Sequence, residues 1–446
     1  MKIKPSAVAG KFYSNSPKEL SAHLGLFKKN HQFDYQYKSR AIIVPHAGYH
    51  YSGQLASEGF SCLDKTVKTV FIIAPPHYVP VRNAALSSFH KWSTPLGEIE
   101  VDQLINDDLV TKFGCEFEDG AFENEHSAEV QVPFIQTYLP KAKIVPILTG
   151  HNQLKIKEII RHYWLNPENA FVISSDLSHF LTTEEAVKID NLTAKMIETK
   201  DMEKFNPNQA CGAVGVHALT DFAREKGYSL IRSGMVNSGD ITGETSRVVG
   251  YGSWFLYEGE KNEFIKKYFS PYVIDICKKS ISARLNSEKL VLEKIPPLFH
   301  GDGACFVTLE KNNDLRGCIG SIIAHRPLVH DLLQNAQNAA FSDPRFQPVT
   351  KEEFGELSID VSLLSAPEKM EFKDEADLLA QIRPFIDGII IKDGSYQAVY
   401  LPSVWEQLPD KVVFLDSLKI KAGMTPKHFS ETFEAYRFTT EYIKAE

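Results

Sequence analysis

The chain has 446 residues, of which 43% are hydrophobic and 24% charged, and its formal net charge is −8 at pH 7. A chain of this length is too long for one ordinary hydrophobic core, so we expect two or more domains. No stretch approaches the ~20 apolar residues of a membrane span, and no apolar signal segment opens the chain, so we expect a cytoplasmic protein that does not act at a membrane. The acidic balance argues against a nucleic-acid surface as the main function. Six cysteines lack CxxC spacing, so neither a zinc ribbon nor, in the reducing cytosol, a disulfide framework is expected.

In the first half of the chain, apolar strand-like runs alternate with helical patterns. The strand-like runs lie at residues 41–45, 69–76, 142–150, 170–176 and 247–259. The helical patterns lie at residues 52–63, 126–139, 152–164 and 183–200. Continuously apolar runs suit strands that are covered on both faces, so this alternation predicts an α/β domain with a mixed sheet flanked by helices.

The pattern changes after the polar segment 258–264, which is the best candidate for a linker. We therefore expect a first domain over residues 1–260 and a second over residues 264–446. The second begins with a helix at 264–285, followed by two strand-like runs within 304–320 that read as a hairpin. A further helix and more strands follow, at residues 329–341, 357–365, 387–394 and 397–402. Mixed hairpins and helices predict a domain of the α+β class.

Histidines and one aspartate follow the strand-like runs of the first half. His46 and His77 each come directly after such a run, Asp176 ends the run at 170–176, and His179 comes three residues later. In sheets of this kind, ligands gather beyond the carboxyl ends of the strands. We therefore expect these side chains to meet at one edge of the sheet, as the groups around a metal ion do.

Two imidazoles and one anionic ligand commonly hold a redox-active or Lewis-acidic metal and leave positions open for oxygen or substrate. His46 and His77 supply the imidazoles, and either Cys211 or Asp176 supplies the anion. A cysteine ligand would make the site softer and favour Fe(II), Cu(I) or Zn(II).

His179 and His126 are then candidates for proton transfer, because an imidazole titrates near neutral pH. Glu125 would orient a neighbouring imidazole by accepting its hydrogen bond. Each of these residues also has a structural alternative. A single histidine after a strand is more often hydrogen-bonded within the fold, and a lone reduced cysteine such as Cys211 is usually a small buried hydrophobe. The joint pattern favours the metal site.

The segments PHAGYHYSG, APPH, ENEHSAE, SSDLSH and the Cys-Gly pair at 211–212 together resemble the Memo family, over residues 1–260. Memo proteins are similar in fold to the class III extradiol dioxygenases, so the resemblance implies a metal pocket at one edge of an α/β sheet. It implies metal ligands at His46, His77 and Cys211. It also implies a pocket lined by Asp176, His179 and His126. Extradiol dioxygenases carry a carboxylate where Memo proteins have this cysteine. This difference argues against ordinary catechol cleavage and leaves metal and oxygen chemistry open.

The second half resembles the AMMECR1 family from residue 264 onward. The resemblance rests on LRGCIG at 315–320, supported by AAFSDPRFQP, DGIIIKDG, LPSVWEQLPD and YRF. Cys318 in LRGCIG is a candidate nucleophile or ligand, with Arg316, Asp343 and Arg345 as candidates for binding an anionic group. The alternative is a tight hairpin strand with a buried cysteine, which is favoured because no base is visible beside the thiol.

In prokaryotes, genes of the Memo and AMMECR1 families often accompany a radical S-adenosylmethionine (SAM) protein, in what is called the AmmeMemoRadiSam system. This chain resembles a fusion of the first two components, so the radical SAM protein is an expected partner in a modification pathway. The leading hypothesis is a non-haem Fe(II) oxidoreductase, with Cu or Zn as alternative metals and a small molecule or peptide as substrate. The alternatives are a non-catalytic metal- or ligand-binding scaffold and a metal-dependent hydrolase.

Overall fold

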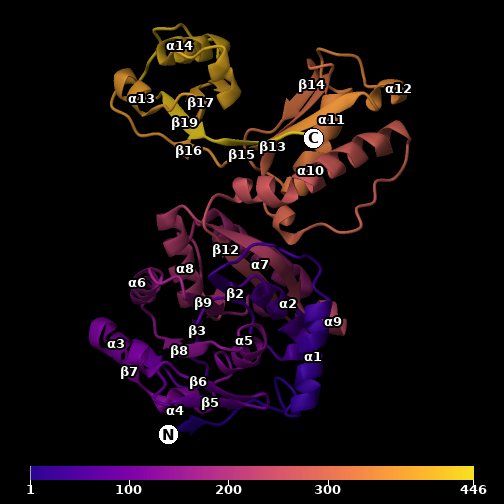
Figure 1. The fold of residues 1–446 in the computed structure, drawn as a ribbon. Helices are drawn as coiled ribbons and strands as arrows, with labels where there is room; N and C mark the ends of the chain where they lie inside the picture. The colour runs from indigo at the N-terminus through magenta and orange to yellow at the C-terminus, as the bar shows by residue number, and fades with distance from the viewer. Residues whose placement is uncertain (1, 446) are drawn as a thin grey trace. The chain divides into compact units, whose positions relative to one another are not determined.

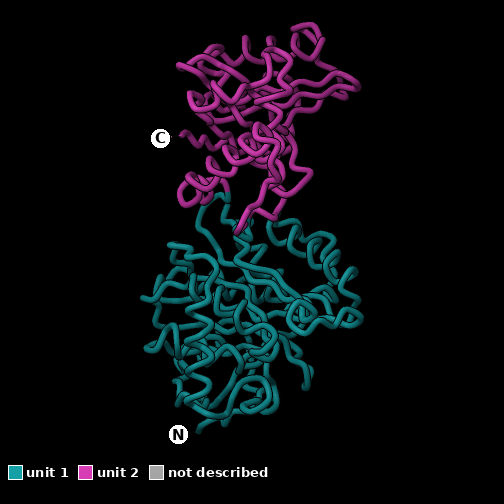
Figure 2. The backbone as a smooth tube through the Cα atoms, turned by 90° about the vertical axis from the view of Figure 1, so that its right-hand side faces the viewer, with its two compact units in different colours: residues 1–261, 296–298 teal, residues 262–295, 299–446 magenta. Residues whose placement is uncertain are grey.

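The computed structural model describes residues 2–445, and the chain divides into two compact units (Figures 1 and 2). Unit 1 comprises residues 1–261 and 296–298, and unit 2 comprises residues 262–295 and 299–446. Among the described residues, no helix is long and apolar enough to cross a membrane.

A mixed sheet of nine strands forms the centre of unit 1, with the order β10-β12-β2-β9-β3-β8-β4-β7 and with β11 paired to β12. Its strands are β2 (Ala41–Val44), β3 (Thr69–Ala74), β4 (Ala84–Leu86), β7 (Glu116–Phe117), β8 (Lys143–Thr149), β9 (Asn169–Ser174), β10 (His179–Leu181), β11 (Ser229–Asn237) and β12 (Val248–Tyr257). β2, β9, β3 and β8 are parallel neighbours, whereas β12 runs antiparallel to β2. Every residue of β2, β3 and β9 is buried, which confirms the prediction of a sheet covered on both faces.

Helices cover both faces of this sheet (Figure 1). Those of unit 1 are α1 (Pro17–Lys29), α2 (Tyr49–Ser61), α3 (Gln103–Phe113), α4 (Asp119–Phe122), α5 (Val132–Tyr138), α6 (Gln153–Tyr163), α7 (Thr183–Thr199), α8 (Ala213–Lys226) and α9 (Ser238–Thr242), with 3-10 turns η1 (Glu129–Gln131) and η2 (Pro207–Gln209). On one face, Ile43 and Phe171 share a core with Ile159 of α6 and Leu219 of α8. On the other, α2 lies so close that a Cβ at Gly59 would be 2.4 Å from Val44 Cγ1.

Two predicted features of unit 1 have different outcomes. The helix expected at 183–200 is confirmed by α7, and Thr182 and Glu185 form a reciprocal capping box at its start. The expected single helix over 126–139 is shorter, because only η1 and α5 are helical there. Pro133 occupies the first turn of α5, where its missing N–H costs nothing, and the residues before η1 form an irregular loop instead. A small sheet of β1 (Ile3–Lys4), β5 (Lys91–Thr94) and β6 (Gly97–Glu100) was not predicted.

Unit 2 contains two four-stranded sheets with the orders β14-β13-β15-β20 and β16-β19-β17-β18. Its strands are β13 (Ala304–Lys311), β14 (Asp314–Gly320), β15 (Leu357–Leu364), β16 (Glu368–Lys369), β17 (Gly388–Asp393), β18 (Tyr396–Tyr400), β19 (Glu434–Phe438) and β20 (Thr440–Ile443). Its helices are α10 (Lys261–Leu285), α11 (Leu328–Phe341), α12 (Lys351–Phe354), α13 (Glu375–Gln381) and α14 (Lys411–Lys421), with 3-10 turns η3 (Pro297–His300) and η4 (Pro402–Glu406). The α+β prediction is confirmed.

The predicted hairpin is the antiparallel pair β13–β14. Its two turn residues, Asn312 and Asn313, have φ values of 54° and 68°, as the two central residues of a type I′ turn require. The predicted linker at 258–264 is only partly irregular, because α10 already begins at Lys261.

We expect residues 1–260 and 261–446 each to fold when expressed separately, because each half contains an apolar core of its own. Circular dichroism should show a cooperative melting transition for each fragment. A fragment that melts without cooperativity would contradict the predicted boundary at residue 260.

Candidate metal centre

Three adjacent strands deliver polar side chains to one edge of the central sheet. β9 lies between β2 and β3 and is parallel to both, so the carboxyl ends of all three strands share that edge. His46, Asp176 and His77 follow the ends of β2, β9 and β3 within two or three residues. The topology therefore brings together side chains that lie up to 130 positions apart in the sequence.

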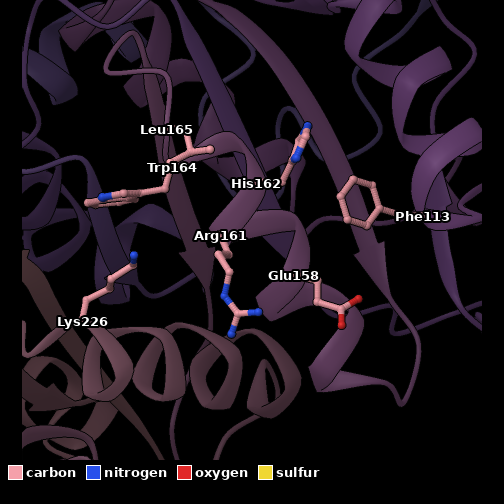
Figure 3. A pocket seen from close by; sticks show the side chains of 7 residues that line it. All are labelled: Phe113, Glu158, Arg161, His162, Trp164, Leu165 and Lys226. Carbon is pink, nitrogen blue, oxygen red and sulfur yellow. The ribbon is translucent and has the colours of Figure 1, made fainter.

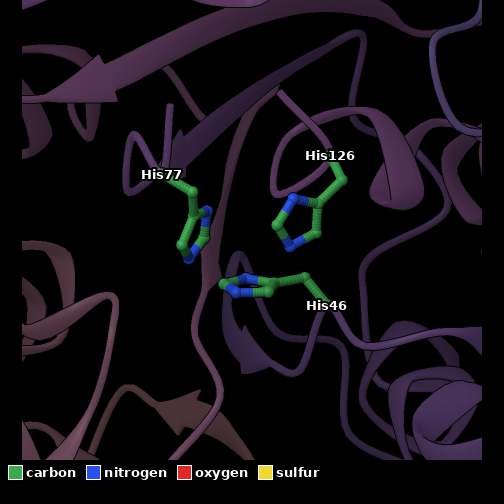
Figure 4. Close-up of side chains that lie close together, drawn as sticks. All are labelled: His46, His77 and His126. Carbon is green, nitrogen blue, oxygen red and sulfur yellow. The ribbon is translucent and has the colours of Figure 1, made fainter. Parts of the chain in front are cut away.

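Three imidazoles form the centre of this site (Figure 4). His46, His77 and His126 each offer one ring nitrogen that lies within 4.8 Å of those of the other two. The ring centroids of His77 and His126 are 4.5 Å apart, and that of His46 lies 5.2 and 5.4 Å from them. The sequence makes His126, which lies in the loop before η1, a candidate for proton transfer. The structure brings it into the same cluster as the two expected ligands, His46 and His77.

A hydrogen-bond chain fixes the protonation of the His46 ring. The hydroxyl of Ser174 donates its single proton to the carbonyl of Ser127, at 2.7 Å, and accepts from Gln131 Nε2 at 2.8 Å. The contact of 2.9 Å between His46 Nδ1 and Ser174 Oγ must therefore have Nδ1 as the donor. Burial, followed by the charges of His126 and His77, holds the pKa of His46 well below its usual value. The neutral ring thus keeps its lone pair on Nε2, the nitrogen that a metal would bind.

Glu125 orients the second imidazole. Its Oε1 accepts a hydrogen bond from His77 Nδ1 at 2.9 Å, which leaves Nε2 of His77 for a metal. The same carboxylate accepts from the backbone N–H groups of His77 at 2.5 Å, and of His126 and Ser127 at 3.0 Å each. Burial alone would raise the pKa of Glu125, but these hydrogen bonds outweigh it and lower the pKa to about 2. The carboxylate is therefore charged and anchors two loops of the site.

The third imidazole has an unsatisfied buried nitrogen. His126 Nδ1 lies 3.3 Å from Glu125 Oε1, outside hydrogen-bonding geometry, and has no other hydrogen-bond partner in the described part of the chain. Burial, followed by the charge of His77, lowers the pKa of His126 to about 4, so the ring is neutral. Buried polar atoms without a partner are rare in native proteins. A cluster of three imidazoles, one of them with an orphaned nitrogen, therefore fits a bound metal ion.

Cys211 and Asp176 lie beside His46. The sulfur of Cys211 is 3.1 Å from His46 Nε2 and accepts a hydrogen bond from the Asp176 backbone N–H at 3.2 Å. Asp176 Oδ1 accepts from the His46 N–H at 2.8 Å, and Oδ2 lies 3.9 Å from His46 Nε2. Burial raises the pKa of Asp176 to about 7 and raises that of the Cys211 thiol well above its usual value. A Cβ at Gly212 would be 2.5 Å from the Ser174 carbonyl oxygen, so this glycine allows Cys211 to approach the strand ends.

His179 stands at the start of β10, where its backbone pairs with Val249 of β12. Its side chain is half-buried, and this burial lowers its pKa, with a smaller contribution from the charge of His77. It is not one of the three imidazoles that lie within 4.8 Å of one another. It lies near the cluster, because its charge affects the pKa of His46 and the charge of His77 affects its own.

The residues singled out in the second half lie in a different environment. Cys318 is on the edge strand β14, and its backbone N–H donates to Asp343 Oδ2 at 2.9 Å. Arg345 donates two hydrogen bonds to Asp343, at 3.0 and 2.7 Å, and Arg316 pairs with Glu353 at 2.6 Å. Both arginines are thus already neutralised by carboxylates of their own unit, which argues against an anion site beside LRGCIG. Cys318 itself is half-buried, whereas the structural alternative expects a buried cysteine.

The hollow drawn in Figure 3 is separate from the imidazole cluster. It has a volume of about 550 Å³ and is lined by residues such as Phe113, Arg161, Trp164 and Leu165. Trp164 and Leu165 come shortly before β9 begins at Asn169, so this hollow lies toward the amino ends of the parallel strands. The metal centre lies at their carboxyl ends.

Single alanine substitutions test the ligand set. We expect His46→Ala, His77→Ala and His126→Ala to lose most of their bound metal, because each removes one nitrogen from the cluster. Metal content per chain, measured by atomic emission, is the readout, and an unchanged melting curve shows that the variant is folded. His162→Ala, which removes an exposed histidine on α6, is the matched control.

Cys211→Ala should also lower the metal content, because its sulfur lies 3.1 Å from the free nitrogen of His46. Full metal occupancy in both His46→Ala and His77→Ala would contradict the assignment of the site.

Glu125→Gln should weaken the affinity for the metal ion by about 10- to 100-fold, because the amide removes the charge that orients His77. Anaerobic competition with a chelator measures this change. Glu123→Gln is the matched control, since Glu123 belongs to the same loop but is exposed. Equal affinities of the two variants would show that Glu125 does not orient a ligand.

Comparison with known proteins agrees with this geometry. The model of the Memo family, described as Memo-like protein, matches residues 4–255, and the AMMECR1 model matches residues 274–443. A MEMO1 family protein of Thermoplasma acidophilum is 33% identical over 271 residues, which is 57% of this chain and 98% of the relative. One of Aquifex aeolicus is 33% identical over 275 residues, covering 57% of this chain and all of the relative.

A crystal structure of an uncharacterized protein from Pyrococcus horikoshii is 32% identical, with a TM-score of 0.36, and the match covers 38% of this chain and 88% of that one. The Memo match spans more than half of the chain, and its range contains every residue of the imidazole cluster. The chain therefore belongs to the Memo-like family and carries an AMMECR1 domain fused to its Memo domain.

Proposed function

We propose that unit 1 is a metal-dependent oxidoreductase of the dioxygenase-like type, with non-haem Fe(II) as its metal. The observation that carries this proposal is the cluster of His46, His77 and His126, with Cys211 and Asp176 beside it, at the carboxyl edge of the sheet. Imidazoles with one carboxylate or thiolate form the donor set that suits Fe(II) and leaves coordination positions open. The membership in the Memo-like family supports the same assignment.

The metal and the residues around it would have different functions in this site. Fe(II) held there would supply redox chemistry with molecular oxygen and Lewis acidity toward the substrate. Glu125 and Ser174 hold the rings of His77 and His46 with their Nε2 atoms free. His46 is only 1% exposed, so its side of the site is closed to bulk water.

Two groups beside the cluster are suited to proton transfer. Asp176 would hold a proton at Oδ2, which lies 3.9 Å from His46 Nε2. His179 would exchange a proton with the substrate through its half-buried ring at the start of β10. Neither group is needed to fill the three-imidazole set, so both are free for this role.

A second candidate function is a hydrolase that uses Zn(II)-activated water. One observation favours it: a cluster of three histidines is also a donor set of catalytic zinc sites, in which water takes the fourth position. The two candidates differ in the metal that they require and in their consumption of oxygen.

The fused domain supports a further part of the proposal. We infer that unit 2 presents or modifies the substrate, which would be a small molecule or a peptide, and that a radical SAM protein acts in the same pathway. Covalent linkage of the two domains raises their effective concentration to ~mM, which would benefit consecutive steps on one substrate.

Anaerobic metal analysis of the full chain, purified without a tag, tests the function. We expect Fe(II) at about one ion per chain, and uptake of oxygen when the reduced protein is exposed to air. His77→Ala and chelator-treated protein should consume no oxygen. Stoichiometric Zn(II) with hydrolytic activity and no oxygen uptake would support the second candidate and overturn the first.

His179→Gln separates metal binding from proton transfer. We expect the variant to keep its Fe(II) but to turn over about 10²- to 10⁴-fold more slowly, because glutamine cannot exchange a proton at neutral pH. Rates of oxygen uptake and metal content, measured on the same sample, provide the test, with His162→Gln as the control. Equal rates would assign His179 a structural role.

A further inference from the structure

A second hollow of unit 1 lies far from the metal centre. Its volume is about 510 Å³, and its lining includes Lys28, Lys29, His31, Asp34, Lys65 and Tyr138. These residues belong to the segments that lead into the parallel strands β2, β3 and β8. The hollow therefore lies toward the amino ends of these strands, at the edge of the sheet opposite to the imidazole cluster. The volume is within the range of ordinary small-molecule sites.

Positive charge is concentrated in this hollow, although the whole chain has a net charge of −8. Lys28, Lys29 and Lys65 face one lining carboxylate, Asp34. All three lysines are exposed, and none of them has an ion pair within 4.0 Å among the described residues.

The ammonium groups of two of these lysines lie near the aromatic ring of Tyr138. The Nζ of Lys65 lies 4.7 Å from the ring centroid and that of Lys28 lies 5.7 Å from it. The Tyr138 hydroxyl is fixed by hydrogen bonds with Ser57, at 2.7 Å, and with His31 Nε2, at 3.1 Å. Ser57 also bonds His31 Nε2 at 2.9 Å, so this wall of the hollow is rigid.

The electrostatic effects on neighbouring groups show that the local potential is positive. Desolvation lowers the pKa of His31, and the charges of Lys28 and Lys65 each lower it by more than the charge of Asp34 raises it. Partial desolvation also lowers the pKa of Lys65. The Cys62 thiol opposes this shift, and the charge of Lys28 lowers the pKa by more than that of Asp64 raises it. His31 is therefore neutral, and Asp34 is the one carboxylate in the lining that faces the three lysines.

A structural role explains only part of this arrangement. Lys65 Nζ donates to the carbonyls of Phe60, at 2.9 Å, and Ser61, at 3.3 Å, and so caps the end of α2. Lys28 and Lys29 lie in the last turn of α1, where positive charge is favourable, but the end of that helix is already capped by the Asn30 N–H. Neither role requires two ammonium groups over one ring.

We propose that this hollow is a binding site for a small molecule that carries a phosphoryl group, separate from the metal centre. A tetrahedral phosphoryl group offers three oxygens to donors that come from different directions, as these lysines do. Lysine binds phosphate as a point charge, whereas planar carboxylates are matched best by the fork of an arginine, and the lining contains no arginine. The ligand would bind at a distance from the metal centre. It would be either an effector or a substrate that this site holds by its phosphoryl group.

Isothermal titration of the full chain with inorganic pyrophosphate tests the proposal. We expect saturable binding of one pyrophosphate per chain at pH 7, weakened by added salt. Lys28→Gln should reduce the affinity about tenfold, the typical effect of losing one charge-assisted hydrogen bond. Lys28 makes no hydrogen bond that the fold depends on, so this variant remains informative if Lys65→Gln, which uncaps α2, melts at a lower temperature.

Two controls distinguish this site from other anion binding. Lys188→Gln changes the net charge by the same amount at an exposed position of α7 and should leave the affinity unchanged. His77→Ala should also leave the affinity for pyrophosphate unchanged. A loss of binding in that variant would show that pyrophosphate binds at the metal centre instead. Equal affinities of wild-type protein and Lys28→Gln would overturn the proposal. Tighter binding to vesicles that contain phosphoinositide, or to a phosphorylated peptide, than to pyrophosphate would overturn its assignment to a small molecule.

Discussion

The parallel pairing of β2, β9 and β3 is the constraint on which the metal centre depends. Ile43 is opposite Ile173, and Phe71 is opposite Phe171, so fully buried apolar residues determine the register of these strands. Burial of each such side chain contributes about 1.5–3 kcal/mol, and a slip by one residue would turn all of them to the other face. The residues that set the position of the site therefore carry none of its chemistry.

One buried carboxylate then converts this approximate placement into a defined geometry. Glu125 receives hydrogen bonds from the ring of His77 and from backbone N–H groups of His77, His126 and Ser127. These hydrogen bonds offset the free-energy cost of burying a charge. The carboxylate therefore stays ionised although only 1% of the residue is exposed. Because Glu125 binds both the loop after β3 and the loop before η1, the positions of two imidazoles depend on the same group.

The sequence predicts the part of this site that follows from strand order. His46, His77 and Asp176 come directly after continuously apolar runs, and this signal is strong because buried parallel strands have a simple pattern. The position of His126 carries no such signal. It lies in an irregular loop whose path depends on hydrogen bonds to Glu125, and such long-range contacts leave no local periodicity. The same limit applies to Arg316 and Arg345. The sequence makes them candidates for binding an anion, whereas in the structure Glu353 and Asp343 neutralise them.

The protonation states of the buried groups explain why the fold does not depend on the bound metal. Desolvation favours the neutral forms of His46, His126, Asp176 and Cys211, so these groups do not add uncompensated charge to the interior. The charge that is buried beside them on Glu125 is stabilised by hydrogen bonds. Small zinc domains fold only with their metal, because the ligands replace a hydrophobic core. Here the core lies in the layers of the sheet and the helices, and the ligand groups lie at its edge. A change of ligand should therefore affect chemistry before it affects stability.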